Sequence, residues 1–276
     1  MRHQTGSFTS SDGLNIHTES WLPDSDPHAV VLISHGIGEH IGRYAHVAAR
    51  LVADRYAVYG LDHRGHGKSD GLRSYFDDLN EPVNDLKQYL DQIKVAQPSK
   101  KIFLYGHSLG SLIALLFTLR YQSEITGLIS SSTPLEVEPS QPKFLIAAAG
   151  VLNNIIPKAA ITPLPTVYIS TDPAEVKAYE TDPLIYHGNV RVRVGYQIVQ
   201  YSRIVKARLS EIKLPLLVFH GSADKICPPA GSETLYRGAG SSDKTLKIYP
   251  GMYHETHNEV EKSTVLNDIA AWLGAH

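Results

Sequence analysis

The chain has a single cysteine, Cys227, in 276 residues, so no intrachain disulfide can form. It also lacks an excess of charge of one sign, with 26 Lys and Arg against 28 Asp and Glu and no long run of either. This balance argues against a nucleic-acid partner, because phosphate contacts need clustered basic side chains. No stretch reaches the roughly 20 apolar residues that cross a bilayer.

The first residues, MRHQTGSFTSSDG, are polar and lack the apolar core of a signal peptide. We therefore expect a cytoplasmic protein. The hydrophobic share of 42% is ordinary for a globular protein, and the length allows a sizeable core without disulfides or metals.

Apolar runs typical of buried parallel strands alternate with helical patterns along most of the chain. The alternation predicts a single α/β domain, residues 1–276, with a mostly parallel, doubly wound sheet. Residues 8–23 alternate around Asp12-Gly13 and predict a hairpin. The predicted strands are 29–34, 56–62, 101–105, 125–132, 215–221 and 244–250, and the predicted helices are 44–54, 77–95, 108–121 and 261–276.

Residues from 134 to about 208 interrupt this rhythm, with scattered prolines and no clear strand–helix alternation. Because the sheet pattern resumes afterwards, we interpret this segment as an inserted cap. Within it, Phe144 to Pro157 carries no charged residue. Two readings stay open: a lid helix whose apolar face meets lipid, or a helix that packs on the body of the protein.

The motif GHSLG places Ser108 between a predicted strand and a predicted helix, which is the context of a nucleophile elbow. Glycines suit this turn, because side chains at Gly106 and Gly110 would clash with the neighbouring strand and helix. The start of the helix also presents free N–H groups to a developing oxyanion.

A serine nucleophile needs a base that a third group holds, and in this fold the chain order is Ser, then Asp or Glu, then His. Asp224 follows the strand at 215–221, and His254 follows the strand at 244–250. Carboxyl ends of parallel strands meet at one crevice, so these residues can come together there. Asp243 and His257 are the competing candidates.

The second oxyanion donor is expected in the loop HGIG after the strand at 29–34. Gly36 and Gly38 would let this backbone turn toward the site. The two donors would then be the N–H groups of Ile37 and Leu109.

Three other motifs fail on spacing. GIGEHIG is one residue too long for a dinucleotide fingerprint, HRGHGKS follows Asp62 where a phosphate loop requires glycine, and HETHN has Asn258 where a zinc motif requires histidine. We therefore predict no metal and no cofactor.

Five linked blocks, HGIGEHIGRY, LDHRGHGKSDG, GHSLG, HGSADKICPP and YPGMYHETHNE, resemble the monoacylglycerol lipase group of the α/β-hydrolases over nearly the whole chain. The resemblance implies Ser108, Asp224 and His254 as catalytic triad and Ile37 and Leu109 as oxyanion donors. It further implies a polar pocket for glycerol, formed by Glu39, Arg43, His107, Tyr179 and His257.

The sequence therefore predicts a serine hydrolase that cleaves monoacylglycerols to fatty acid and glycerol through an acyl-enzyme. The alternative is a general carboxylesterase or lysophospholipase with the same triad. We expect a small lipid ester as substrate, no obligate protein partner, and transient contact of the cap with membrane surfaces. Cys227, three residues after Asp224, is either a reactive thiol near the pocket or a buried inert one.

Overall fold

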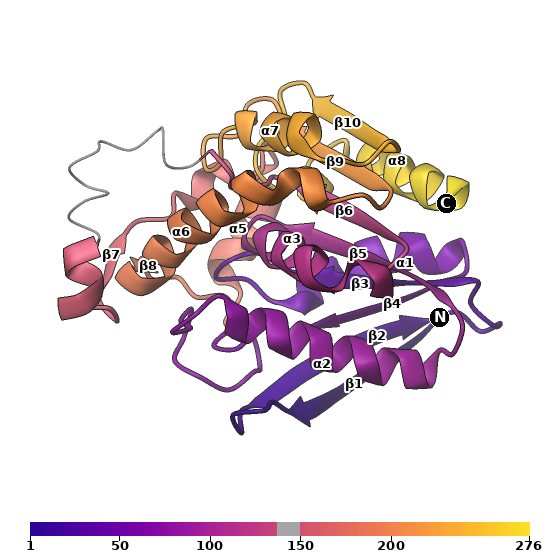
Figure 1. The fold of residues 1–276 in the computed structure, drawn as a ribbon, viewed down its shortest axis with the longest axis horizontal. Helices are drawn as coiled ribbons and strands as arrows, with labels where there is room; N and C mark the ends of the chain where they lie inside the picture. The colour runs from indigo at the N-terminus through magenta and orange to yellow at the C-terminus, as the bar shows by residue number, and fades with distance from the viewer. Residues whose placement is uncertain (137–149) are drawn as a thin grey trace.

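The computed structural model describes residues 1–136 and 150–276. Strands in these ranges form an eight-stranded sheet in the order β1-β2-β4-β3-β5-β6-β9-β10 (Figure 1). The first two strands form the expected hairpin and pair antiparallel, as do β2 and β4, whereas the other neighbours pair parallel. The predicted α/β class with a mostly parallel sheet is confirmed. The strands are β1 (Arg2–Thr9), β2 (Asn15–Leu22), β3 (Ala29–Ser34), β4 (Tyr56–Leu61), β5 (Lys101–His107), β6 (Gly127–Ser131), β9 (Leu216–Gly221) and β10 (Lys244–Tyr249).

Helices cover both faces of this sheet because the central strands are apolar on both sides. In β3, Val30 and Leu32 join the core under α2, α3 and α7, whereas Val31 and Ile33 join the core under α1 and α8 (Figure 1). These helices are α1 (Ala45–Ala53), α2 (Asn80–Ala96), α3 (Leu109–Tyr121), α7 (Ala230–Gly238) and α8 (Lys262–Ala275). The sequence did not predict α7, since Leu235 is the one large apolar side chain that it buries.

The predicted cap segment is more regular than its sequence suggested. It contains a short antiparallel pair, β7 (Ala160–Thr162) and β8 (Val190–Arg191), and the helices α5 (Pro173–Thr181) and α6 (Val192–Arg208). α6 crosses over α3 (Figure 1). Of the predicted lid helix, 150–155 are helical, whereas 144–149 lie outside the described residues.

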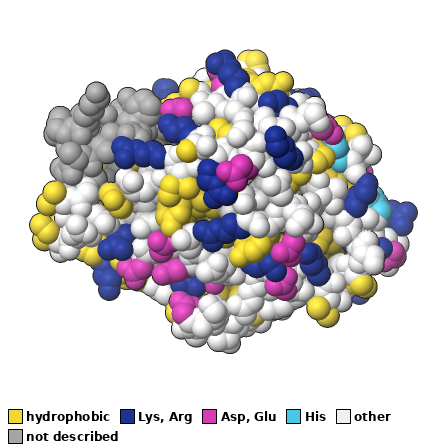
Figure 2. All heavy atoms as spheres, in the orientation of Figure 1, with side chains coloured by type: hydrophobic (Ala, Val, Ile, Leu, Met, Phe, Trp, Pro, Cys, Tyr) yellow, Lys and Arg dark blue, Asp and Glu magenta, His cyan; other side chains and the backbone are white. Residues whose placement is uncertain are grey.

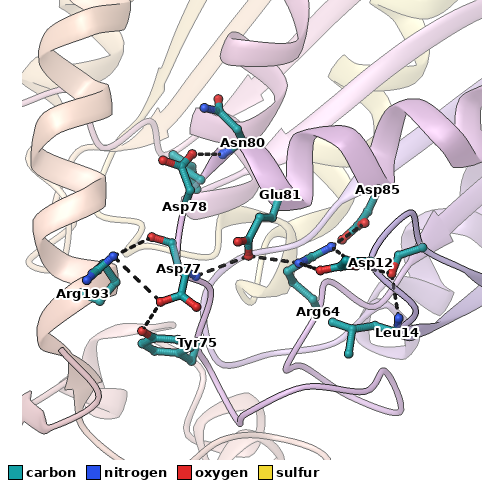
Figure 3. A network of polar contacts seen from close by, with 12 residues as sticks. Asp12, Leu14, Arg64, Tyr75, Asp77, Asp78, Asn80, Glu81, Asp85 and Arg193 are labelled. Carbon is teal, nitrogen blue, oxygen red and sulfur yellow. Dashed lines mark hydrogen bonds and ion pairs between the residues drawn. The ribbon is translucent and has the colours of Figure 1, made fainter.

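Polar contacts attach α6 to the start of α2. Arg193 Nη1 donates to the carbonyl of Asp77 at 3.2 Å (Figure 3). Two turns further along α6, the hydroxyl of Tyr201 donates to Asp78 Oδ1 at 2.7 Å. These contacts hold α6 against the segment that leads into α2.

Candidate active site

Ser108 occupies the sharp turn between β5 and α3. Its backbone adopts φ 51° and ψ −119°, in the left-handed region that costs a non-glycine residue free energy. The turn fits because the residues two positions away on each side, Gly106 and Gly110, have no side chain: a Cβ on Gly110 would collide with the carbonyl oxygens of Ser34 and His35. This strained geometry presents the Ser108 hydroxyl at the edge of the sheet.

The structure brings Ser108, His254 and Asp224 together from three distant segments. Ser108 Oγ lies 2.9 Å from His254 Nε2, and His254 Nδ1 lies 2.7 Å from Asp224 Oδ2. His254 is placed by the loop after β10, and Asp224 by the loop after β9. The hydroxyl can donate to Nε2 while Nδ1–H donates to the carboxylate, so the imidazole is set to accept the serine proton.

Asp224 is held in place by more than His254. Its Oδ1 accepts the backbone N–H groups of Ile226 at 2.7 Å and Cys227 at 3.0 Å. Its Oδ2 also accepts from His220 Nε2 at 2.8 Å. Sequence reasoning missed His220, although its place at the end of β9, directly before Gly221, was the available signal.

Asp224 and His254 shift each other's pKa values. Burial by itself would raise the pKa of Asp224, but the imidazoles of His254 and His220 hold it well below its usual range. Burial would lower the pKa of His254, yet the charge and hydrogen bond of Asp224 raise it above its usual value. An ionised Asp224 therefore favours a proton on His254, as a general base requires.

Two backbone N–H groups flank the serine. Leu109 is the first residue of α3, and the loop of Ile37 passes so close that a Cβ on Gly36 would lie 3.4 Å from Ser108 Cβ. In the part of the chain that the structure describes, neither the Ile37 nor the Leu109 N–H donates to another protein group. Both are free to bind an oxyanion.

Two cavities meet at Ser108. The larger has a volume of about 480 Å³ and is lined mainly by apolar side chains, many of them from the predicted cap segment. The smaller has a volume of about 20 Å³ and shares Ile37, Ser108, Leu164 and Ile226 with the larger one. Its wall also contains the polar residues Glu39, His107, Tyr179, His254 and Glu255.

Glu39 and Glu255 enclose the guanidinium of Arg43. Arg43 Nη1 lies 2.7 Å from Glu39 Oε2 and 2.7 Å from Glu255 Oε1, and its Nη2 lies 2.6 Å from Glu255 Oε2. Burial would raise the pKa of Glu255, but Arg43 lowers it to about 2. Burial raises the pKa of Glu39 despite the same partner. Sequence reasoning missed Glu255, although it directly follows His254.

Of the five residues expected around glycerol, three line the small cavity and two do not. Glu39, His107 and Tyr179 line the small cavity. Arg43 and His257 do not line it but contact the lining residues from behind. Arg43 Cζ lies 4.8 Å from the ring centroid of Tyr179, and the ring of His257 is stacked on that of Tyr44 with 4.9 Å between the ring centroids. Burial lowers the pKa of His107 to about 3, so its imidazole is neutral.

The competing residues lie elsewhere. Asp243 contacts His276 at 3.0 Å, and the ring of His257 faces Tyr44 and His107.

Cys227 is buried in the wall of the larger cavity, where burial raises the pKa of its thiol well above the usual value. This favours the inert reading of Cys227, because the thiolate is the reactive form. Within 1–136 and 150–276, no cluster of three or more His, Cys, Asp and Glu is placed to hold a metal ion.

The order Ser, Asp, His on a mostly parallel sheet, with the serine on a strand-to-helix turn, defines a serine hydrolase of the α/β-hydrolase class. A family model described as serine aminopeptidase, S33, matches residues 25–261, and the chain belongs to this family.

Three known proteins are similar over nearly their whole length. The monoacylglycerol lipase of Mycolicibacterium smegmatis is 36% identical over 98% of this chain and 96% of its own. The monoglyceride lipase of Homo sapiens is 35% identical over 96% of this chain and 89% of its own. The crystal structure of Paleococcus ferrophilus monoacylglycerol lipase superposes with a TM-score of 0.83 at 29% identity, covering 100% of both chains. The predicted resemblance to the monoacylglycerol lipase group is confirmed.

Proposed function

We propose that the protein hydrolyses monoacylglycerols to fatty acid and glycerol through an acyl-enzyme on Ser108. The observation that carries this proposal is the 2.9 Å contact between Ser108 Oγ and His254 Nε2 at the meeting point of two cavities. The larger, apolar cavity suits an acyl chain, and the small polar one suits the alcohol side of the ester. The names of the similar relatives support the same substrate.

In the proposed reaction, Ser108 attacks the ester carbonyl while His254 takes the hydroxyl proton. Asp224 orients the imidazole and stabilises the cation that forms. The Ile37 and Leu109 N–H groups hold the oxyanion of the tetrahedral intermediate. His254 then returns the proton to the glycerol oxygen as the ester bond breaks. Water that His254 deprotonates attacks the acyl-enzyme, and His254 returns that proton to Ser108 Oγ as the fatty acid leaves.

The small cavity favours a neutral alcohol over a phosphorylated one. Its wall carries the carboxylates of Glu39 and Glu255, which can accept hydrogen bonds from hydroxyl groups. The nearby cation, Arg43, is already bound by both carboxylates and is not free for a phosphate. Since the cavity measures about 20 Å³, its wall must adjust to admit glycerol. Arg43 and His257 would act from behind the wall.

The test is monoacylglycerol hydrolysis by the wild type and Ser108→Ala. We expect the variant to lose at least about a thousandfold in kcat/KM, because nothing else supplies the nucleophile. Ser111→Ala is the matched control: Ser111 is a buried serine of α3 whose hydroxyl contacts Ser130 and Thr133. It should remain active. Equal rates for wild type and Ser108→Ala would refute the proposal.

A substrate panel separates the alternatives. We expect monoacylglycerol to be preferred over lysophosphatidylglycerol of the same acyl chain by at least about tenfold, from repulsion by the net negative charge that remains on Glu39 and Glu255 after Arg43 offsets one of them. A preference for the lysophospholipid would make the protein a lysophospholipase. A preference for short-chain esters over both would make it a general carboxylesterase.

We also propose transient contact of the cap, residues 134–208, with membrane surfaces. Val151 and Ile155 are 60% and 69% exposed, and hydrophobic side chains gather at the left end of the molecule in Figure 2. Among the described residues, no helix combines the length and apolar character needed to span a bilayer. Flotation with neutral vesicles tests this contact, and Val151→Glu with Ile155→Glu should weaken it. Unchanged flotation of that double variant would refute it.

A further inference from the structure

The imidazole of His35 lies behind the oxyanion loop and is fully buried. Its Nδ1 is 2.8 Å from the carbonyl oxygen of Gly36, and its Nε2 is 2.9 Å from the backbone nitrogen of His63. The backbone N–H of His63 can only donate, so Nε2 must be the unprotonated nitrogen. The ring proton therefore sits on Nδ1 and is donated to Gly36. Burial and the nearby imidazole of His63 lower the pKa of His35 well below its usual value, which keeps the ring neutral.

The carbonyl that His35 binds belongs to the same planar peptide unit as the Ile37 N–H. Orienting one end of a planar peptide orients the other. A hydrogen bond at the carbonyl also polarises the amide and strengthens its N–H as a donor. On the other side of Gly36, its own N–H donates to Glu39 Oε1 at 2.6 Å. Both peptide groups of Gly36 are thus held by buried side chains.

We propose that His35 is a positioning residue for oxyanion stabilisation. Its Nδ1–H holds the Gly36–Ile37 peptide so that the Ile37 N–H points at the oxygen that becomes negative. The inference rests on the proposed function for one assignment, Ile37 as oxyanion donor, and it requires no particular lipid substrate.

A matched control is present in the same histidine cluster. The ring of His66 lies 5.4 Å from that of His35, is also buried, and its Nδ1 bonds a backbone carbonyl, that of Arg64, at 2.9 Å. Its Nε2 has no partner in the described ranges. His35→Phe and His66→Phe each remove one buried imidazole and its hydrogen bond to a backbone carbonyl. Only His35→Phe removes a hydrogen bond to the Gly36–Ile37 peptide.

The experiment uses p-nitrophenyl acetate, with active sites counted by titration with a fluorophosphonate. We expect His35→Phe to lower kcat about tenfold to a hundredfold with little change in KM, since the loss is confined to the transition state. Affinity for a trifluoromethyl ketone, which forms an oxyanion on the serine, should fall by the same factor. Affinity for an unreactive alkyl glycerol ether should not change. His66→Phe should lower the melting temperature but leave kcat and ketone affinity near wild type.

His35→Asn keeps an N–H donor near the Nδ1 position and should recover part of the loss. Where His35→Phe does not fold, His35→Gly against His66→Gly gives the same comparison of ketone affinity per folded site. Equal ketone affinity in the His35 variant and the wild type, or equal losses in the His35 and His66 variants, would overturn the proposal. Activity that survives Ser108→Ala would instead reject the proposed function, so the two failures are distinguishable.

Discussion

The Nε2 of His220 lies 2.8 Å from Asp224 Oδ2, the oxygen that also accepts from His254 Nδ1 at 2.7 Å. Ser232 Oγ lies 2.7 Å from the other ring nitrogen of His220 and can donate to it, which leaves the ring proton on Nε2. His220 is fully buried at the end of β9. One carboxylate thus joins two imidazoles, of which only His254 reaches Ser108.

Removing His220 should therefore impair His254 as general base, because the two imidazoles share the carboxylate of Asp224. We expect His220→Leu to lower kcat/KM for ester hydrolysis at least about tenfold, because Asp224 loses a charge-assisted hydrogen bond and can rotate away from His254. His220→Gln, whose amide can donate from a similar position, should recover part of that activity. Wild-type kinetics in His220→Leu would contradict this role.

Activity should fall on the acid side as His254 becomes protonated. The pKa of His254 is raised above 6.5 by Asp224 despite burial, so the midpoint of the acid limb of kcat/KM should lie above pH 6.5. Glu255 also raises this pKa. Glu255→Gln should therefore move the midpoint to lower pH, since it removes a negative charge that favours the protonated ring.

The control for that shift is Glu233→Gln, which removes an exposed carboxylate paired with Arg237 on the surface. Its pH profile of kcat/KM should match the wild type. A midpoint in Glu255→Gln that stays in place or rises would contradict the electrostatic coupling.

Gly110 should tolerate no side chain. A Cβ there would collide with the backbone oxygens of Ser34 and His35, which cannot move without distorting β3. We expect Gly110→Ala to lower the free energy of unfolding by at least about 2 kcal/mol, measured by denaturant titration. Gly274→Ala is the counterpart in α8, where nothing lies within 4 Å, and it should be neutral or stabilising by up to about 1 kcal/mol. Equal stability of the two variants would argue against the close approach.

The larger cavity should set the acyl-chain length. Gly195 lies in its wall on α6, and the nearest atom to a Cβ there is 4.0 Å away, so a larger side chain can enter the cavity. We expect Gly195→Trp to lower kcat/KM for a long-chain monoacylglycerol about tenfold or more, with little effect on p-nitrophenyl acetate. An equal loss with both esters would place the acyl chain elsewhere.

Arg64 should stabilise the fold far more than surface arginines do. It bonds Asp85 through Nε at 2.7 Å and Nη2 at 2.9 Å, and also bonds Asp12 and Glu81 (Figure 3). Arg64→Leu leaves the carboxylate of Asp85 buried without its partner, which should cost about 3–5 kcal/mol of unfolding free energy. Arg237→Leu, which breaks the exposed pair with Glu233, should cost less than about 1 kcal/mol. Similar losses would contradict this difference.

Local patterns were sufficient for most of the fold. Each buried strand appears as a continuous apolar run, and Gly106 and Gly110 indicate the turn at Ser108 because only glycine fits beside it. Helices without such a pattern were missed: α7 buries little apolar surface, and α6 packs one side on α3 while its polar side chains bind Asp77 and Asp78, just before α2.

The sequence by itself determined the strand–helix alternation, the turn at Ser108 and a short choice of carboxylates and imidazoles at strand ends, because these depend on neighbouring residues. The tertiary structure alone decided that His254 faces Ser108, that Arg43 lies behind the wall, and that Glu255 binds it. Arg43 and Glu255 are 212 positions apart, and such a contact depends on how the sheet and its loops pack rather than on any local spacing.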